Sequence, residues 1–304
     1  MKILITGMTG FIGRSLAKAL ADRHELHGLR ADLLDFEAVG AQLAALRPEM
    51  IVHLAARTEV ERSFYEPVSF SSVNYVGTIN VIEHARRLES LRLFVFASTA
   101  ETYGWQPECE EILRDGKLRA HRPFDEQTPQ HPNAPYAVAK LACERYLEYA
   151  GRAGGFPWTI LRQSNTYGRT DNDFFVMEQI VTQMLRSPTE INLGDPRPYR
   201  SFLHIDDLVA LYARVIEMPE IVAFEHFCTG PPNAIQIEAL AEKIADQIGW
   251  RGRINWYRKP KRDGEIYYLD SSHDKAKRML GWEPRVDLDS GLARTIEQWR
   301  GLRA

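Results

Sequence analysis

A tyrosine and a lysine that could move a proton lie four residues apart, as Tyr136 and Lys140 in the segment YAVAK. If this segment is helical, the spacing places the phenol and the ammonium group on one face. A free tyrosine titrates at about pH 10, and a neighbouring lysine favours its phenolate form. The pair could therefore act as an acid or a base, although an isolated Y-x-x-x-K pattern is more often an exposed helix face.

Further reactive groups follow the apolar run Leu93–Ala97, which is typical of a buried strand. The next residues are Ser98-Thr99-Ala100-Glu101, and ligands of open parallel sheets bind beyond the carboxyl ends of the strands. Thr99 could donate a hydrogen bond to a substrate oxygen, and Glu101 adds a carboxylate. The alternatives are an ordinary turn cap for Thr99 and a solvated charge for Glu101.

Three glycines, Gly7, Gly10 and Gly13, follow the apolar segment Lys2–Thr6 and lead into a helical pattern. The first would allow a tight turn, the second a close approach of the main chain to a pyrophosphate, and the third close packing of helix and strand. The N–H groups at the start of the helix would bind an anion. The spacing departs by one residue from G-x-G-x-x-G, so the strand-turn-helix context carries the prediction of a dinucleotide site, with a purely structural turn as the alternative.

The elements that position these residues alternate along the chain, which predicts βαβ units and a doubly wound parallel sheet of the α/β class. The expected strands are Lys2–Thr6, Glu25–Leu29, Met50–Leu54, Leu93–Ala97, Trp158–Gln163 and Phe224–Cys228. The expected helices begin at Phe11 and otherwise span Phe36–Leu46, Pro67–Leu88 and Tyr136–Ala150. Shorter elements between Gly- and Pro-rich loops indicate a smaller lobe in the second half, and the polar segment 105–123 is expected to be a loop or lid.

The composition excludes several classes of protein. The chain has 304 residues, 44% hydrophobic and 26% charged, as in soluble globular proteins, and its net charge of -3 provides no basic field for nucleic acid or an anionic membrane. Three separated cysteines indicate neither a zinc site nor a disulfide framework and fit a reducing cytoplasm. No segment resembles a membrane span or targeting peptide. His24 and His27 lack a third convergent ligand, so no metal is expected.

Taken together, these segments resemble those of extended short-chain dehydrogenases/reductases of the nucleotide-sugar epimerase/dehydratase group. The resemblance runs almost from end to end through Gly7-x-x-Gly10-x-x-Gly13, Asp32-Leu33, His53-Leu54-Ala55-Ala56, Asn74 in VNYVGTINVIE, STAETYG from Ser98, PYAVAK from Pro135, LRQSNTYG from Leu161, RSFLHIDDL from Arg200 and LGWEP from Leu280.

The resemblance implies a Rossmann-like doubly wound parallel sheet with a smaller C-terminal substrate-binding lobe. The dinucleotide-binding domain would comprise residues 1–164 and about 203–228, and the nucleotide-sugar lobe about 165–202 and 229–304. The long helices of the first domain resemble those that pair in a homodimer in this family, so a homodimer is expected.

The resemblance also implies roles for individual residues. Tyr136 would be the acid/base, Lys140 would hold the ribose and lower the pKa of the tyrosine, and Thr99 would assist at the sugar, with Glu101 as a further candidate catalytic residue. The residues implied for the dinucleotide are Gly7, Gly10, Phe11, Ile12, Gly13, Arg14, Arg30, Asp32, Leu33, Leu54, Ala55, Ala56, Tyr136 and Lys140, with Asp32 and Leu33 at the adenine.

The nucleotide diphosphate of the substrate would be held by Asn165, Arg200 and Arg262. Arginine suits this task because its planar guanidinium binds phosphate oxygens with two hydrogen bonds. Arg258 competes with Arg262, since the segment KPKRDGE departs from the usual spacing of the family. The alternative for Arg200 is a solvated surface charge.

Two residues bear on the cofactor and one on the reaction. Arg30 stands at the end of the second strand, where an NAD enzyme would place an acid on the ribose, and Arg14 could reach the same region. We therefore expect NADP, with NAD as the alternative. Ala100 occupies a position where the related 4,6-dehydratases carry an acid or hydrogen-bond donor, so loss of water is disfavoured.

The sequence thus predicts hydride transfer at C4 of a nucleotide-diphosphate sugar, with a 4-keto-6-deoxysugar reductase first. A 4-epimerase or 4,6-dehydratase with a retained NAD is the alternative. A dinucleotide-binding regulatory protein without activity is a second alternative, disfavoured because Tyr136 and Lys140 are both present. The segment 105–123 is expected to close over the sugar.

Overall fold

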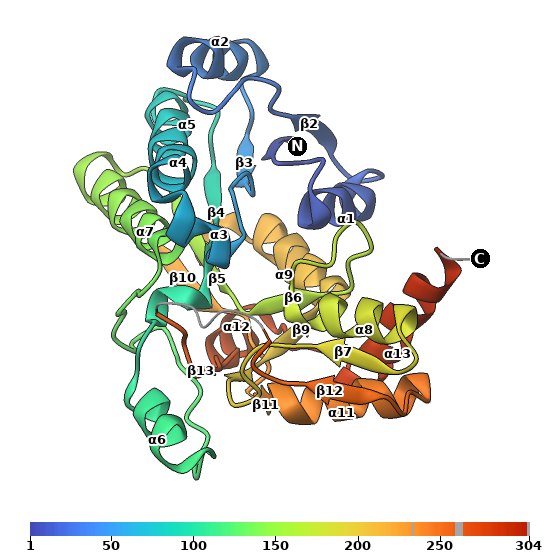
Figure 1. The fold of residues 1–304 in the computed structure, drawn as a ribbon. Coiled ribbons are helices and arrows are strands. Elements are labelled where there is room, and N and C mark those ends of the chain that lie inside the picture. Colours follow the sequence, from blue (N-terminus) through green and yellow to red (C-terminus); the bar gives the residue numbers. More distant parts are fainter. Residues whose placement is uncertain (233, 259–263, 303–304) are drawn as a thin grey trace.

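A computed structural model describes residues 1–232, 234–258 and 264–302. A parallel sheet carries helices on both faces, and a smaller lobe lies beyond the carboxyl ends of its strands (Figure 1). Arg262, one of the predicted substrate ligands, lies outside the described residues.

The central sheet has six strands in the spatial order β10-β5-β4-β3-β1-β2, all parallel. Their bounds are β1 Lys2–Thr6, β2 Glu25–Gly28, β3 Met50–His53, β4 Leu93–Thr99, β5 Trp158–Gln163 and β10 Glu225–Cys228. The chain winds to opposite sides of β1, because β2 lies on one side and β3 on the other. Ligands of open α/β sheets bind where the winding reverses in this way.

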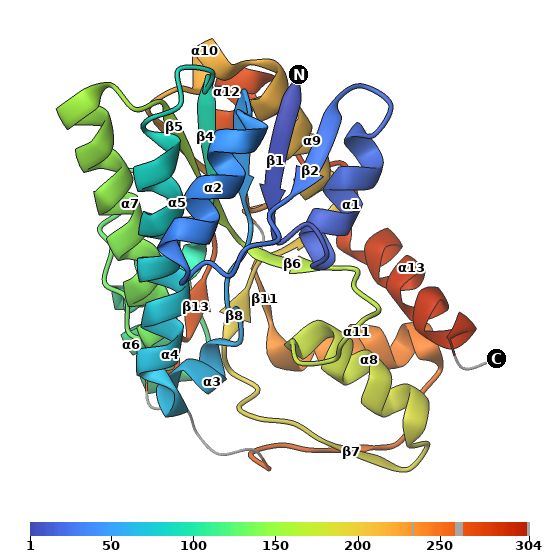
Figure 2. The same cartoon turned by 90° about the horizontal axis from the view of Figure 1, so that it is seen from above.

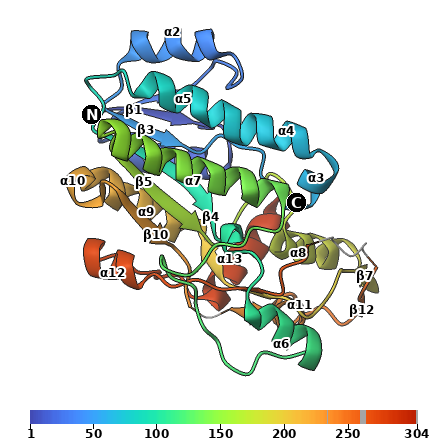
Figure 3. The ribbon, with the colours of Figure 1, turned by 90° about the vertical axis from the view of Figure 1, so that its left-hand side faces the viewer.

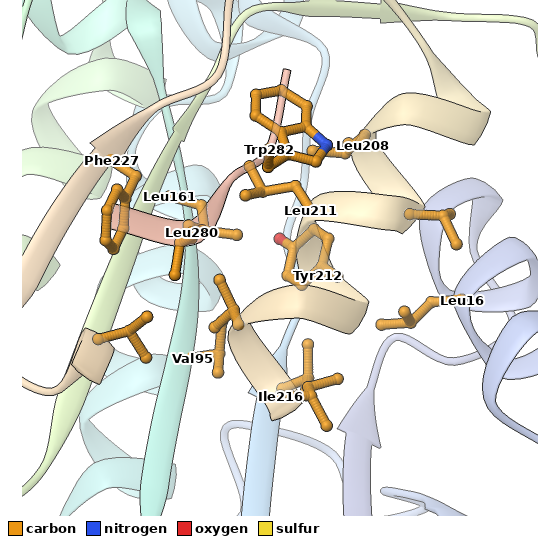
Figure 4. Packing of buried hydrophobic residues seen from close by; sticks show 14 of the residues in the cluster. Leu16, Val95, Leu161, Leu208, Leu211, Tyr212, Ile216, Phe227, Leu280 and Trp282 are labelled. Carbon is orange, nitrogen blue, oxygen red and sulfur yellow. The ribbon is translucent and has the colours of Figure 1, made fainter. Parts of the chain in front are cut away.

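Helices cover both faces of this sheet. One face carries α1 Phe11–Leu20, α9 Ile205–Glu217, α10 Pro219–Val222 and α12 Asp274–Leu280, and Figure 4 shows Leu208, Leu211 and Tyr212 of α9 packed towards Val95 and Leu161 of the sheet. The other face carries α2 Phe36–Leu46, α5 Gly77–Ala85 and α7 Pro135–Gly154, while α3 Val60–Tyr65 and α4 Pro67–Ser71 pack against α7 (Figure 3). Burial of each large apolar side chain in these layers contributes about 1.5–3 kcal/mol.

The lobe has its own hydrophobic core, which includes Trp250 and Trp299. Its helices are α8 Val176–Arg186, α11 Ile237–Ile248 and α13 Leu288–Gly301. Its strands are β6 Asn165–Tyr167, β7 Glu190–Asn192, β8 Tyr199–Arg200, β9 Phe202–His204, β11 Ile235–Gln236, β12 Arg253–Asn255 and β13 Tyr268–Leu269, and they form small sheets (Figure 2). The expected α/β fold, a doubly wound parallel sheet with a smaller lobe, is confirmed.

One expected long helix is interrupted. The segment predicted as Pro67–Leu88 forms α4, a π-helical turn over Ser72–Val76, and α5. Within the turn, the side chain of Asn74 accepts a hydrogen bond from the N–H of Arg57 (2.8 Å) and donates one to its carbonyl oxygen (2.9 Å). The hydrogen bonds of Asn74 to the loop after β3 thus coincide with the π-helical turn. Such turns are frequent at functional sites.

The segment 105–123 also differs from expectation, because it contains the helix α6, Pro107–Asp115. The helix begins with a proline, ends at Gly116 in the left-handed region (φ 73°), and buries Cys109 and Ile112. These two side chains join a cluster with Tyr103 and Tyr268. The segment is therefore packed against the lobe through an apolar face.

Within the described ranges, no helix has the length and apolar character needed to span a bilayer.

Candidate active site

The glycine-rich loop between β1 and α1 has the geometry predicted for a phosphate cradle. Gly7 has a φ of +69°, and a Cβ atom there would lie 2.8 Å from the amide nitrogen of Ala55. A Cβ atom on Gly13 would lie 2.3 Å from the carbonyl oxygen of Gly7. Gly10 precedes the first turn of α1 and brings no side chain to cap its N–H groups. These residues fit a dinucleotide, because the turn admits close approach of a pyrophosphate to the main chain.

Hydrogen bonds hold the ends of β1 and β3 together next to this cradle. The Thr6 hydroxyl accepts from the N–H of Ala55 (3.1 Å) and lies 2.9 Å from Nδ1 of His53, whose Nε2 lies 2.9 Å from the Thr78 hydroxyl. Burial, assisted by the charge of Lys140, lowers the pKa of His53 to about 3. The imidazole is therefore neutral and acts as a fixed link between the sheet and α5.

The two residues predicted at the adenine, Asp32 and Leu33, differ in solvent exposure. Leu33 is buried against α5, where a Cβ on Gly77 would contact it at 2.8 Å, while Asp32 is exposed and accepts a hydrogen bond from the N–H of Leu34. Leu54, Ala55 and Ala56 follow β3 and are partly exposed at the cradle.

Tyr136, Lys140 and Thr99 come together where β4 ends against α7. Tyr136 and Lys140 lie on the buried face of α7, with 8% and 2% of each residue exposed. The ammonium group of Lys140 donates to the carbonyl oxygen of Ala97 (2.8 Å) and lies 4.8 Å from the centre of the Phe96 ring. The side-chain oxygen of Thr99 accepts from the N–H of Glu101 (3.2 Å), so Thr99 caps a turn as well as facing the phenol.

Burial shifts both titrating groups of this pair towards their neutral forms. It raises the pKa of Tyr136 above its ordinary value, as does the charge of Glu101, while a hydrogen bond with Thr99 acts in the opposite direction. Burial also lowers the pKa of Lys140 to about 8, against the raising effects of Cys143 and Glu144. At neutral pH the tyrosine is a protonated phenol beside a largely protonated amine, an arrangement that can deliver a proton.

The two described candidates for the substrate diphosphate lie in two different small sheets of the lobe, Asn165 on β6 and Arg200 on β8. The guanidinium of Arg200 forms an ion pair with Glu265 (3.0 Å) and donates to the carbonyl oxygen of Tyr199 (3.0 Å). Asn165 donates to the carbonyl oxygen of Ser201 (3.2 Å). Arg200 is therefore not the solvated surface charge of the alternative interpretation, since only 8% of the residue is exposed.

The competing arginine lies in a different place. Arg258 is exposed and lines a polar pocket of about 480 Å³ with Glu190, Asn192, Arg253 and Asn255, beside the pairing of β7 with β12.

The two predicted cofactor arginines have different surroundings. Arg14 donates to the carbonyl oxygen of Thr9 (2.6 Å) and forms an ion pair with Asp171 (2.6 Å), so its guanidinium is directed at the loop that follows β6. Arg30 is exposed in the short connection after β2, where the side chain of Gln42 accepts from its N–H (2.9 Å) and donates to the carbonyl oxygen of Gly28 (3.0 Å). Gln42 thus fixes the backbone of this connection.

A buried ion pair that the sequence interpretation missed lies one helical turn beyond Lys140. Glu144 of α7 pairs with Arg162 of β5 at 2.9 Å, and their side chains are 0% and 3% exposed. Two signals were available: Glu144 lies four residues after Lys140, and Arg162 is a charged residue within the predicted strand Trp158–Gln163. No group of three potential metal ligands was found among the residues described.

Comparisons with known proteins show the family to which the chain belongs. The family model of the NAD dependent epimerase/dehydratase family matches residues 3–230. The chain is 27% identical over 308 residues to GDP-6-deoxy-D-mannose reductase of Pseudomonas aeruginosa, covering 98% of this chain and 97% of that protein.

Two solved structures show the same fold. UDP-glucose 4-epimerase of Thermus thermophilus in complex with NAD matches with a TM-score of 0.86 and 26% identity, covering 99% of both chains. RMD of Pseudomonas aeruginosa in complex with NADPH matches with a TM-score of 0.83 and 25% identity, covering 99% of this chain and 100% of that chain.

The chain therefore belongs to the NAD-dependent epimerase/dehydratase family. It is an NAD(P)-dependent enzyme of the extended short-chain dehydrogenase/reductase type, and its relatives modify nucleotide sugars.

Proposed function

We propose that the protein reduces the 4-keto group of a nucleotide-diphosphate 4-keto-6-deoxysugar with NADPH. The observation that carries this proposal is the phenol of Tyr136, buried beside Lys140 and Thr99 at the carboxyl end of β4. A ketone that accepts a hydride needs a proton at its oxygen, and the hydroxyl of Tyr136 is a group that can donate one.

The dinucleotide, when bound, supplies the hydride. Among the protein groups, Thr99 would donate a hydrogen bond to the C4 oxygen, Tyr136 would deliver the proton to the same oxygen, and Lys140 would hold a ribose hydroxyl of the dinucleotide. The positive charge of Lys140 also favours the phenolate that remains after proton transfer. Glu101 lies close enough to raise the pKa of Tyr136 and so keeps the phenol protonated before reaction.

The surroundings of Ala100 argue against elimination of water. Its methyl group is buried, with 1% of the residue exposed, in the apolar cluster that includes Tyr103 and Phe124. A methyl group cannot protonate a leaving hydroxyl. Similarity to GDP-6-deoxy-D-mannose reductase over nearly the whole chain is compatible with reduction, and similarity to UDP-glucose 4-epimerase over the same extent keeps epimerisation as the alternative.

For the cofactor we propose NADP, because Arg30 is exposed and follows β2, and an arginine near the ribose accommodates a 2′-phosphate in enzymes of this fold. Charge-assisted contacts to phosphate are among the stronger hydrogen bonds in proteins. NAD remains the alternative, and relatives of both kinds are known from the solved structures.

For the substrate we propose that Asn165, Arg200 and Arg262 hold the diphosphate from the lobe. Arg200 is already held by Glu265, which orients its guanidinium and limits the entropy lost on binding. Residues 1–164 and about 203–228 would thus bind the dinucleotide, and about 165–202 and 229–304 the nucleotide sugar.

We also propose a cytoplasmic homodimer. Exposed apolar side chains gather on α4, the π-helical turn and α7, namely Val68, Val76, Val138 and Tyr149. Figure 3 shows α4, α5 and α7 side by side on this face. Sedimentation would test the dimer with Val138→Lys, which should yield a monomer.

The buried free thiols of Cys109, Cys143 and Cys228 fit a reducing compartment such as the cytoplasm.

NADPH oxidation tests the proposed reaction. Purified protein is mixed with NADPH and 4-keto-6-deoxyhexoses carried by GDP, dTDP or UDP, with Tyr136→Phe as the control. The proposal expects one NADPH consumed for each sugar reduced by the wild-type protein. Epimerisation or dehydration by a retained NAD, without net consumption of added cofactor, would identify the alternative reactions. Cofactor binding without turnover of any sugar would identify a regulatory protein.

A further inference from the structure

Helix α7 contacts β4 at three successive strand residues. Lys140 donates to the carbonyl oxygen of Ala97 (2.8 Å), Tyr136 faces Thr99, and between these two contacts the Ser98 hydroxyl donates to the carboxylate of Glu144. Tyr136, Lys140 and Glu144 are four residues apart, so they share one face of the helix.

The Glu144 carboxylate is completely buried and both of its oxygens are used. Oε1 accepts from Ser98 and lies 3.3 Å from Nε of Arg162, while Oε2 accepts from Nη2 of Arg162 (2.9 Å) and from the amide of Gln130 (3.0 Å). Ser98 and Arg162 are direct neighbours in the β4–β5 ladder. The side chain of Glu144 on α7 therefore connects β4 at Ser98 with β5 at Arg162. Ser98 directly precedes Thr99.

A second route leads from Glu144 to Thr99 through Gln130, in the segment that precedes α7. The Gln130 amide also donates to the Thr102 hydroxyl (3.0 Å), and that hydroxyl donates to the carbonyl oxygen of Thr99 (2.8 Å). The backbone of Thr99 is thus held from the side of Ser98 and from the side of Thr102. A displacement of about 1 Å at a reacting group can reduce the rate about a hundredfold, so such support matters for turnover.

We propose that Glu144 is a positioning residue for the proposed reaction: its buried carboxylate, shared by Ser98, Arg162 and Gln130, holds the end of β4 that carries Thr99 against the helix that carries Tyr136 and Lys140. This inference rests on the proposed function for its effect on turnover. The holding of β4 itself can be measured without any substrate.

The charge of Glu144 gives the proposal a second consequence. It acts to raise the pKa of Lys140, against the effect of burial. The groups that face Lys140 are otherwise uncharged or only weakly polar: the Ala97 carbonyl and Phe96 ring from β4, the neutral His53 from β3, and Cys143 from α7, whose pKa burial raises to about 12. Arg162, behind Glu144 on β5, compensates part of the carboxylate charge.

Two variants separate positioning from a general role in stability. Ser98→Ala removes one hydrogen bond and leaves the ion pair intact. The double variant Glu144→Gln/Arg162→Met removes both charges together, because replacing only one would leave the other buried and unpaired. Glu148→Gln is the matched control, since Glu148 lies one turn further along α7 and pairs with Arg145 (2.6 Å) and His226 (3.1 Å) instead of β4.

Hydrogen–deuterium exchange and steady-state kinetics provide the readouts. For Ser98→Ala, the proposal expects amide exchange at residues 97–102 to be faster by up to about tenfold and kcat to fall about tenfold, with the dissociation constant of NADPH within about twofold of the wild type. The double variant should show the same changes in exchange and in kcat. In its pH profile, kcat/KM should also begin to fall at a lower pH than in the wild type, because Glu144 no longer raises the pKa of Lys140. Glu148→Gln should change none of these.

The proposal would be overturned if Ser98→Ala and the double variant both matched the control Glu148→Gln in kcat and in exchange at residues 97–102. So would a fall in thermal stability without any local change in exchange. Tyr136→Phe should abolish turnover but leave the exchange of this segment unchanged. If the wild-type protein turns over no nucleotide sugar, the proposed function fails, while the exchange measurement still decides whether Glu144 holds β4.

Discussion

Replacing Lys140 with methionine should make the stability of the protein less dependent on pH. Lys140 is buried, with 2% of the residue exposed, and burial lowers the pKa of its ammonium group from 10.5 to about 8. A change of this size corresponds to a cost of about 3 kcal/mol for keeping the charged amine in the folded state. The wild-type protein pays this cost in full below pH 8, where the amine is charged in both states.

The sign of the pH dependence follows from the proton count. Between pH 8 and 10.5 the unfolded chain holds the proton on Lys140 more tightly than the folded protein, so the free energy of unfolding rises with pH. From about pH 7.5 to about pH 9.5, the wild-type protein should gain about 2 kcal/mol relative to Lys140→Met. Loss of the contact with the Ala97 carbonyl lowers the free energy of unfolding equally at both pH values. The change in the stability difference between the two pH values therefore reports the charge of Lys140 alone.

Urea denaturation of both proteins at the two pH values is the assay. Lys140→Leu serves as a second apolar variant that controls for packing. A stability difference between wild type and Lys140→Met that stays the same within about 0.5 kcal/mol at both pH values would refute the reasoning. The same variants should lose turnover by about a hundredfold or more, because the cation beside Tyr136 is gone. A group retained at a cost in stability is the usual sign of a functional requirement.

Three further outcomes are expected. Tyr136→Phe should fold normally and bind cofactor, but lose turnover by about a hundredfold or more; near-normal turnover would rule out this proton donor. Arg30→Ala should weaken NADPH binding about 10- to 100-fold and leave NADH binding nearly unchanged in fluorescence titrations, and an equal loss for both would exclude a 2′-phosphate contact. Asp270→Asn should stabilise the protein by about 2 kcal/mol more at pH 7.5 than at pH 4.5 in thermal denaturation. Burial raises the pKa of Asp270 to about 6, so the wild-type protein loses stability as the pH rises through this value; equal gains at both pH values would contradict the assignment.

The central sheet and the pair on α7 could be predicted from sequence because their signals are local. Buried parallel strands contain runs of apolar residues, as in Ile3–Ile5, and Lys2–Thr6 was predicted with its observed bounds. Helix α2 was likewise predicted as Phe36–Leu46, preceded by Asp35, whose side chain accepts from the N–H of Ala38. Tyr136 and Lys140 needed only a helical spacing to be placed together.

The features that were missed depend on contacts between distant parts of the chain. Helix α6 has few apolar residues, and its Cys109 and Ile112 gain a partner only when Tyr268 is brought beside them by folding. The π-helical turn is held by Asn74 against the loop after β3. Glu144 and Arg162 lie on different elements, so neither residue indicates its partner locally. Long-range pairing of this kind overrides local propensity.

Deuterium transfer tests the central claim most directly. The protein is incubated with NADPH that carries deuterium at C4 of the nicotinamide, in separate samples for each face of the ring, and with the 4-keto-6-deoxy nucleotide sugar that it consumes. The account predicts that one of the two samples yields a sugar with one deuterium at C4, in a one-to-one ratio with the NADP formed. A product without deuterium at C4 from both samples, or turnover without oxidation of NADPH, would contradict it.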